Sequence, residues 1–361
     1  MHYAQTLQNS IWMREFLTDL LGETMMKRQF AVLIAIFFLF VNAARGQEPT
    51  PLKLLQSYKL PADVKGNFDH FAIDTAGNRL FATPEAYKAV LVFDIKTGNL
   101  IHKITGIEKP HAILYREDLK RLFVTDGDAG DVKIVDSVSY KVLSSVKLLE
   151  DADSIGYDPT TKYLYIDNGG GDVHQTYSML SVVDTTAGKK LADIKIDGDT
   201  LEAMALEKSN PKIYVNNKAK SQVDVIDREK RALIASWPIT KAKTNVAMAY
   251  DEANHRLFIA CRSGGIVVLD TQTGKEITVL PITKGVDDLV YDSASKRLYA
   301  SCDGDAAVYQ QTDSDNYKLL AKVPTGPLAR TALLVPQLQR YFVAVPQHGT
   351  RAAEVLVFEV R

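Results

Sequence analysis

Chargeable side chains recur at one position of a repeating pattern in this sequence. Successive copies of the position lie 41 to 49 residues apart and hold Asp69, His111, Asp153, Glu202, Val246, Asp287 and Arg330. Clustered carboxylates, together with carbonyl and amide oxygens, suit a hard cation such as Ca²⁺. A carboxylate or imidazole beside that cation can act as a base toward an ester or lactone, and a guanidinium can hold a carboxylate or phosphate. The spacing therefore predicts a polar site if the fold brings these positions together.

Further polar side chains flank this position in several copies. The ligand-binding set that we expect at one mouth of a central channel comprises Asp69, His70, His111, Asp153, Glu202, Asn245, Asp287, Asp288 and Arg330. Two interpretations are open, a ligand site or a hydrated channel that tolerates charge without a ligand. No catalytic residue is assigned, because the sequence has no Gly-x-Ser-x-Gly elbow, Cys-x-x-Cys-His haem site or His-Glu-x-x-His zinc helix.

The unit that carries these positions is marked by an Arg-Leu-Phe motif or a close variant. The aromatic residues that anchor its seven copies are Phe81, Phe123, Tyr165, Tyr214, Phe258, Tyr299 and Phe342. A fixed period of about 40 to 50 residues is typical of propellers and other arrays. Each unit holds four short apolar runs separated by turn residues, as at residues 94–98, which indicates four strands. We therefore predict an all-β, seven-bladed β-propeller of four-stranded antiparallel sheets.

The two ends of the repeat array complement each other. The seventh unit supplies three strands, near residues 331–335, 341–345 and 355–360. Residues 53–60 resemble the fourth strands of other units, such as residues 318–323. We therefore expect this N-terminal strand to complete the last blade and to cover its edge.

Residues 1–46 differ in character from the rest of the sequence. Lys27 and Arg28 precede an apolar run at residues 30–41, and the small residues Ala43, Ala44 and Gly46 follow. This order is that of a secretory signal peptide, and the run is shorter than the roughly 20 residues of a membrane helix. We assign residues 1–46 to an upstream extension and signal peptide, with an uncleaved anchor as the alternative. Residues 47–361 are expected to form one propeller domain, periplasmic or extracellular, without a membrane span.

The overall charge limits the kinds of partner that we expect, and the cysteine positions indicate whether a disulfide can form. The formal net charge is -1, whereas a nucleic-acid surface normally shows a strong basic excess. The expected partner is therefore a small molecule or another protein.

Cys261 and Cys302 stand at equivalent sites of neighbouring units. Packed sheets are about 10 Å apart, and bridged cysteines need Cα atoms within about 7 Å, which predicts two buried thiols.

A family resemblance rests on the second and third strands of the unit. Residues 121–125, Arg-Leu-Phe-Val-Thr, and residues 132–136, Val-Lys-Ile-Val-Asp, are similar to the YVTN-type propeller repeat. The chain after the signal segment resembles secreted YncE-like proteins. The resemblance implies the propeller fold. It implies no activity, because the family has no general established one and propellers host binding scaffolds and enzymes alike.

Two functions of different classes follow. The first is a binding or interaction scaffold that holds a small ligand or ion at the channel mouth. The alternative is a metal-assisted hydrolase resembling the lactonase propellers, with Asp153, Glu202 and Asp287 as cation ligands and His111 as acid or base. Ca²⁺ is the cation that such oxygen ligands would suit. The sequence leaves open whether the protein is an enzyme.

Overall fold

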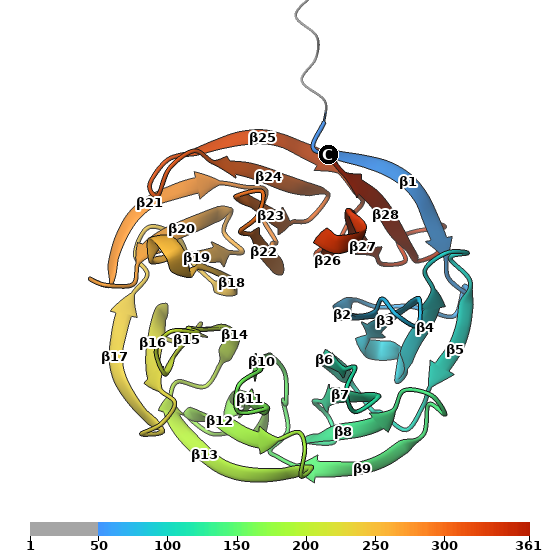
Figure 1. Cartoon of the computed structure of the whole chain (residues 1–361), viewed down its shortest axis with the longest axis horizontal. Helices are drawn as coiled ribbons and strands as arrows, with labels where there is room; N and C mark the ends of the chain where they lie inside the picture. Colours follow the sequence, from blue (N-terminus) through green and yellow to red (C-terminus); the bar gives the residue numbers. More distant parts are fainter. Residues whose placement is uncertain (1–49) are drawn as a thin grey trace, which may run out of the picture. The chain divides into compact units, whose positions relative to one another are not determined.

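The computed structural model describes residues 50–361, which form seven four-stranded antiparallel sheets in a ring around a central axis (Figure 1). In six of these sheets the four strands are consecutive in the chain, and the first strand is the innermost. The predicted seven-bladed β-propeller is thereby confirmed. The predicted signal segment, residues 1–46, and its boundary with the propeller lie outside the described residues.

The first three blades follow one another in the chain. Blade one consists of β2 (Phe68–Asp74), β3 (Arg79–Pro84), β4 (Val90–Asp94) and β5 (Leu100–Ile104). Blade two consists of β6 (Pro110–Arg116), β7 (Arg121–Asp126), β8 (Asp131–Asp136) and β9 (Val142–Lys147). Blade three consists of β10 (Ile155–Asp158), β11 (Tyr163–Gly169), β12 (Tyr177–Asp184) and β13 (Lys189–Asp197).

The next three blades repeat this arrangement. Blade four consists of β14 (Leu201–Leu206), β15 (Lys212–Asn217), β16 (Gln222–Asp227) and β17 (Ala232–Pro238). Blade five consists of β18 (Asn245–Asp251), β19 (Arg256–Cys261), β20 (Gly265–Asp270) and β21 (Lys275–Pro281). Blade six consists of β22 (Asp288–Asp292), β23 (Arg297–Ser301), β24 (Asp305–Gln311) and β25 (Tyr317–Pro324).

Blade seven joins the two ends of the described chain. It consists of β26 (Thr331–Val335), β27 (Arg340–Val345), β28 (Glu354–Val360) and, as its outermost strand, β1 (Leu52–Lys59). β1 pairs antiparallel with β28. The buried carboxylate of Glu354 accepts hydrogen bonds from Ser57 and Lys59 of β1 and, at 2.8 Å, from Arg351 Nε. The predicted closure by residues 53–60 is confirmed, with the strand beginning and ending one residue earlier.

Apolar side chains on both sides of each sheet hold the blades together. Successive residues of a strand point to opposite faces, and each blade packs against a neighbour on either side. Leu80 therefore joins the core between blades seven and one, while the next residue, Phe81, joins the core between blades one and two. Both side chains are fully buried. The Arg-Leu-Phe motif thus supplies one apolar side chain to each of two cores.

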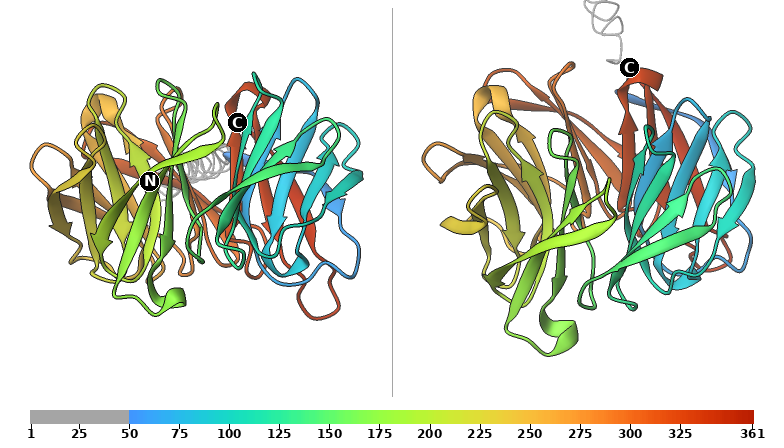
Figure 2. Two further views of the ribbon diagram at one scale, coloured as in Figure 1. Left: turned by 90° about the horizontal axis from the view of Figure 1, so that it is seen from below. Right: turned by 60° about the horizontal axis from the view of Figure 1, so that its bottom comes forward.

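The turns emerge at the two faces of the ring (Figure 2). One face, which we call the mouth face, carries the turns between the second and third strands of each blade and the connections from each blade to the next. At the other, the opposite face, first strands turn into second strands. Among the described residues four short 3₁₀-helices occur in such connections, at Glu85–Tyr87, Gly170–Val173, Glu252–Asn254 and Pro336–Leu338.

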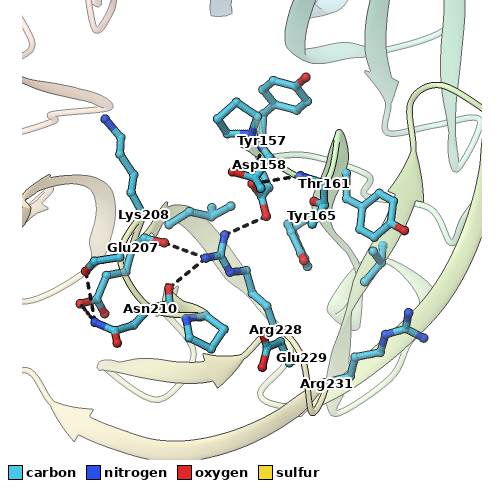
Figure 3. A pocket seen from close by; sticks show the side chains of 17 residues that line it. Tyr157, Asp158, Thr161, Tyr165, Glu207, Lys208, Asn210, Arg228, Glu229 and Arg231 are labelled. Carbon is cyan, nitrogen blue, oxygen red and sulfur yellow. Dashed lines mark hydrogen bonds and ion pairs between the residues drawn. The ribbon is translucent and has the colours of Figure 1, made fainter.

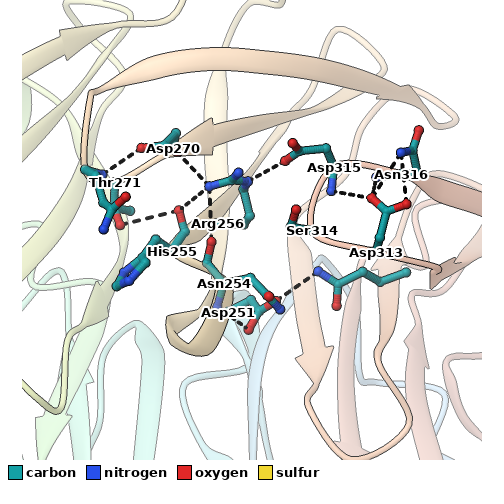
Figure 4. Close-up of polar contacts among 12 residues, drawn as sticks. Asp251, Asn254, His255, Arg256, Asp270, Thr271, Asp313, Ser314, Asp315 and Asn316 are labelled. Carbon is teal, nitrogen blue, oxygen red and sulfur yellow. Dashed lines mark hydrogen bonds and ion pairs between the residues drawn. The ribbon is translucent and has the colours of Figure 1, made fainter.

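The arginine of the motif connects neighbouring blades at the opposite face. Arg256, the first residue of β19, donates to Asp270 of its own blade at 2.8 Å and to Asp315 of blade six at 2.7 Å (Figure 4). Beside it, Gln311 Nε2 of blade six donates to Asp251 Oδ2 of blade five at 2.9 Å. Each charged group in this contact has a partner, so the arrangement serves the packing of the blades.

Both cysteines are buried free thiols, as predicted. Cys261 lies in the core between blades four and five, and Cys302 lies in the core between blades five and six. Burial raises the pKa of each thiol to about 12, so neither is a reactive thiolate. Within residues 50–361 no helix has the length and apolar character needed to cross a membrane.

Candidate functional site

Seven of the nine predicted side chains meet around one cavity at the mouth face. The innermost strands all begin at this face, so their first residues reach the channel together. The cavity has a volume of about 180 Å³, and its predicted lining residues are Asp69, His70, His111, Asp153, Glu202, Asp287 and Asp288. The wall is completed by Glu85, Ser154, Ala203, Val246, Ala247, Met248, Arg262 and Leu289. The structure brings these residues together; their role in ligand binding stays a prediction.

Carboxylates and imidazoles alternate along one part of this wall. Asp288 Oδ1 lies 3.6 Å from His70 Nδ1, and His70 Nε2 lies 3.5 Å from Asp69 Oδ1. The second carboxylate oxygen of Asp69 contacts His111 Nδ1, which lies 3.7 Å from Asp153 Oδ1. Blades six, one, two and three thus contribute five groups, which we call the carboxylate–imidazole chain.

The imidazoles of this chain are held in their charged form. Burial by itself would lower the pKa of His70, but the carboxylates of Asp69 and Asp288 outweigh burial and raise that pKa to about 9. At His111 burial is likewise outweighed by Asp69 and Asp153, and the pKa is again about 9. In return, the charges of the two rings lower the pKa of Asp69 despite its burial. Asp69 is therefore an ionised carboxylate between two imidazolium rings.

Other carboxyl groups around the cavity have too little positive charge near them to offset the cost of burying an ionised carboxylate. Burial, together with the charge of Asp69, raises the pKa of Asp153 and of Glu85. Burial also raises the pKa of Asp288 to about 7, although His70 acts in the other direction. Beneath them the carboxyl pKa of Asp167 is raised well above its usual range by burial and by the charge of Asp153. The mouth therefore holds more carboxyl groups than its cations neutralise.

Two predicted residues are ion-paired with cations that the sequence interpretation missed. Glu202 contacts Lys218, and Asp287 contacts Arg262. Lys218 and Arg262 both stand four residues after the anchor aromatic of their repeat, where the second strand ends. Glu85, another lining residue that was missed, holds the same position in blade one. Extending the alignment forward from the anchor, as well as back from it, would have found all three.

Asn245 and Arg330 do not line the cavity. The register of β18 shifts just after Asn245, whose amide nitrogen donates to Asn216 Oδ1 at 3.0 Å. This side chain is therefore buried between blades four and five. Arg330 turns toward Asp303 of blade six, with 3.3 Å between Arg330 Nη2 and Asp303 Oδ2. Asn245 stands one residue before Val246, which lines the cavity, and the residues at the same position as Asn245 in blades one and four, Phe68 and Leu201, are buried as well. Arg330 does stand at the channel-facing position, but its side chain has found a partner on blade six.

One group of side chains among residues 50–361 has the geometry to hold a metal ion. It consists of Asp69, His70 and Asp153, each with one donor atom within 4.8 Å of the others. Of the set predicted from the sequence, Asp153 belongs to this group, whereas Glu202 and Asp287 contact Lys218 and Arg262; metal binding by that set stays a prediction. Two carboxylates and an imidazole suit a divalent transition metal better than Ca²⁺, which prefers oxygen ligands.

A larger cavity, of about 450 Å³, lies between blades three and four at the opposite face (Figure 3). Arg228 reaches into it and donates to Asp158 Oδ2 at 3.0 Å and to the carbonyl oxygens of Glu207 and Asn210 at 2.7 and 2.9 Å. The guanidinium is thereby committed to the contact between the two blades. We place the candidate site at the channel mouth because carboxyl groups outnumber basic side chains there and burial raises the pKa of several of them.

Comparisons with known sequences support a limited resemblance. No protein-family model matches the sequence. The chain is 32% identical over 115 residues to a Salmonella typhi protein described as uncharacterized protein YncE, and 31% identical to its counterpart from Salmonella typhimurium. The chain spans about a third of the length of these curated relatives, 32% in each case. It therefore resembles YncE proteins over that part, and their description names no activity.

Comparisons with solved structures concern the fold. A chain of Kuenenia stuttgartiensis hydrazine synthase has a TM-score of 0.65 and 16% identity, over 81% of this chain and 96% of that one. A chain of the mitotic checkpoint complex has a TM-score of 0.67 and 13% identity, over 88% and 93% of the two chains. At these identities the likeness extends to the propeller fold alone.

Proposed function

We propose that this protein is an exported binding scaffold that holds a small cationic ligand, either a metal ion or an organic cation, at its channel mouth. The observation that carries the proposal is the surplus of acidic groups around the cavity. Six carboxyl groups line it together with three basic side chains, His70, His111 and Arg262, and a fourth basic group, Lys218, contacts Glu202. An incoming cation can take the place of the protons that the remaining carboxyl groups retain.

The protonation of the wall supports the same conclusion. The raised pKa values of Asp153 and Asp288 mean that these groups retain protons where an ionised carboxylate would be costly. A cation can replace those protons and gain charge-assisted contacts at the same time. The groups stand at the beginnings of strands, which fixes their spacing before a ligand arrives and reduces the ordering cost of binding.

The geometry favours this function over metal-assisted hydrolysis. Of the three cation ligands that the hydrolase hypothesis requires, Glu202 is held by Lys218 and Asp287 by Arg262. Asp153 alone belongs to the group that could hold a metal ion. Export is proposed on the sequence pattern of residues 27–46, and interaction with another protein stays a prediction.

Calorimetric titration of residues 47–361, dialysed first against a chelator, tests the proposal. The probes are Mg²⁺, Ca²⁺, Mn²⁺ and Zn²⁺ chlorides and ethylammonium chloride. We expect at least one to bind at a single site, and the Asp153→Asn variant to bind it at least about tenfold more weakly, a loss of about 1.4 kcal/mol.

The matched control is Asp128→Asn, the same chemical change at an exposed turn of blade two. Its affinity should equal that of the wild type. Failure of every probe to bind, or equal weakening by both substitutions, would contradict the proposed function.

A further inference from the structure

The cavity between blades three and four, at the opposite face, has a wall of aromatic rings and hydroxyl groups. Its volume of about 450 Å³ lies within the range of roughly 300 to 1,000 Å³ that is typical of small-molecule sites. The side chains that blade three contributes include Tyr157, Thr160, Thr161, Tyr163 and Tyr165 (Figure 3). We call this space the tyrosine cavity.

Tyr165 lines this cavity with a hydroxyl group that has no partner in the described chain. The residue is 3% exposed, and its Oη makes no hydrogen bond within residues 50–361. Tyr165 is the anchor aromatic of its repeat, and four of the seven anchors are phenylalanine. The packing of a blade therefore needs the ring but not the hydroxyl. Because a buried hydroxyl without a partner is costly, we expect this one to bond to a ligand or to water.

Further hydroxyl groups of the wall are available for a ligand. Those of Thr160, Thr161 and Tyr163 also make no hydrogen bond within residues 50–361. The turn that carries the two threonines is held in place, because Asp158 Oδ1 accepts a hydrogen bond from the backbone nitrogen of Thr160 at 2.9 Å. Each hydroxyl both donates and accepts a hydrogen bond. A matching ligand must therefore do both, at several points.

The charged groups inside the tyrosine cavity already have partners. Arg228 contacts Asp158 at 3.0 Å, and Glu207 accepts hydrogen bonds from Asn210 Nδ2 and Tyr214 Oη, each at 2.9 Å. The remaining charged side chains of the wall, Lys208, Glu229 and Arg231, are exposed. The inner wall thus offers rings and hydroxyl groups without an unpaired charge, which favours a neutral ligand.

We propose that the tyrosine cavity binds a neutral saccharide, with a sugar ring against Tyr163 and a sugar hydroxyl bonded to Tyr165 Oη. Sugar hydroxyls donate and accept, as the hydroxyl groups of the wall do. The C–H groups of a sugar ring carry slight positive charge and pack against the negative face of an aromatic ring. This site lies apart from the channel mouth, so the inference goes beyond the proposed function and does not depend on it.

The ordered wall also reduces the cost of binding. Arg228 Nη2 donates to the carbonyl oxygens of Glu207 and Asn210 at 2.7 and 2.9 Å, which fixes the turn of blade four that faces the tyrosines (Figure 3). Groups that are already held in place lose little freedom when a ligand arrives. The contact between the blades thereby shapes the cavity as well as joining them.

A panel of neutral sugars tests the proposal on the wild-type protein. The probes are glucose, galactose, mannose, N-acetylglucosamine, maltose and cellobiose, screened by saturation-transfer NMR and then titrated. We expect at least one to bind with a dissociation constant of about 1 mM or below, which is about -4.1 kcal/mol. Its open-chain alditol, which keeps the hydroxyl groups and lacks the ring, should bind at least about tenfold more weakly.

Two variants of the wall locate the bound sugar. Tyr165→Phe removes one hydroxyl and should weaken binding about fivefold, while the stability of the fold stays unchanged because that hydroxyl has no partner. Tyr163→Leu keeps an apolar side chain without the aromatic ring and should also weaken binding about fivefold. Far-UV circular dichroism checks the fold of each variant.

The matched control is Tyr299→Phe, the same change at the anchor aromatic of blade six. The hydroxyl of Tyr299 also lacks a partner within residues 50–361, but it is sealed in the core between blades six and seven. This variant should bind the sugar as the wild type does. Asp153→Asn at the channel mouth should do so as well.

The outcomes that would overturn the proposal are distinct from those that concern the mouth. Failure of every sugar to bind, or an alditol that binds as tightly as its sugar, removes the saccharide. Equal affinities of Tyr165→Phe and Tyr299→Phe place the sugar outside the tyrosine cavity. Weaker binding by Asp153→Asn would place it at the mouth. Cation binding at the mouth is unaffected by any of these results.

Discussion

Between blades five and six, Arg256 contacts both Asp270 and Asp315. At the channel mouth, by contrast, Asp69 and Asp153 both contact the single imidazolium ring of His111. The two regions use the same residue types at opposite ends of the strands. In the first, each of these charged groups has a partner within 2.8 Å. In the second, acidic groups outnumber basic ones, and several acidic groups retain protons.

The difference separates charges that stabilise the fold from charges that are available to a ligand. Arginine is suited to the first role, because its planar fork can bond to a carboxylate and to backbone carbonyls of two blades at once. Buried groups of like charge destabilise a folded protein and are tolerated mainly where function needs them. Carboxyl groups whose pKa is raised by burial, more than the presence of charge, therefore mark the candidate site.

The largest expected effect comes from breaking the contact between blades three and four. Arg228→Met removes the partner of Asp158, whose side chain is 8% exposed, and should cost about 4 kcal/mol in the free energy of unfolding. Arg262→Met at the mouth, where the side chain is 38% exposed, should cost less than about 1 kcal/mol. Urea unfolding followed by circular dichroism measures both. Equal losses in the two variants would remove the distinction between charges in the contacts of neighbouring blades and charges at the channel mouth.

The contacts of Glu354 that join β28 to β1, which we call the clasp, should give a somewhat smaller effect on the free energy of unfolding, and this effect should depend on pH. Burial alone would raise the pKa of Glu354, but Lys59, Ser57 and Arg351 outweigh it and lower the pKa to about 2. Its stabilisation is therefore present above the unfolded value of 4.5 and is lost as the pH falls through about 2. Glu354→Gln should cost about 3 kcal/mol at pH 7 and nothing near pH 2.

The control for the clasp is Glu359→Gln, on the same strand, where the carboxylate is 37% exposed. It should leave the free energy of unfolding essentially unchanged at either pH. A cost for Glu354→Gln that persists unchanged below pH 2 would show that packing, and not charge, holds β1 in place.

The third effect concerns the mouth, where stability should fall as the pH rises. The pKa values of His70 and His111 are raised to about 9. Their stabilisation is therefore complete below the unfolded value of 6.5 and is lost as the pH rises through about 9. In chelator-treated protein we therefore expect the free energy of unfolding to fall between these pH values.

His111→Asn should reduce that alkaline loss, while Glu354→Gln should leave it unchanged. Urea unfolding at pH 6.5 and pH 9 measures the difference. The buried cysteine thiols, whose pKa is raised to about 12, contribute to the loss only as the pH approaches the unfolded value of 9.0, and they do so equally in the wild type and in His111→Asn. A slope that is the same in His111→Asn as in the wild type would mean that the carboxylate–imidazole chain is not coupled to folding.

The fold could be predicted almost completely, because each blade repeats the same local pattern. Phe81 and Phe258 anchor equivalent strands and are both fully buried. The closing strand was predictable because residues 53–60 have the pattern of a fourth strand. The site was predicted in part: the start of each innermost strand could be aligned, but the alignment was not extended to the ends of the second strands, where Arg262 lies.

The sequence by itself determined the number of blades, the closure and the height in the ring at which charged residues stand, since these follow from periodicity along the chain. Only the tertiary structure decided which charges meet. Asp69 lies between the rings of His70 and His111, and Arg330 turns away to Asp303. Such partners are chosen by the direction of each side chain and by the approach of neighbouring blades, which a repeat pattern does not contain.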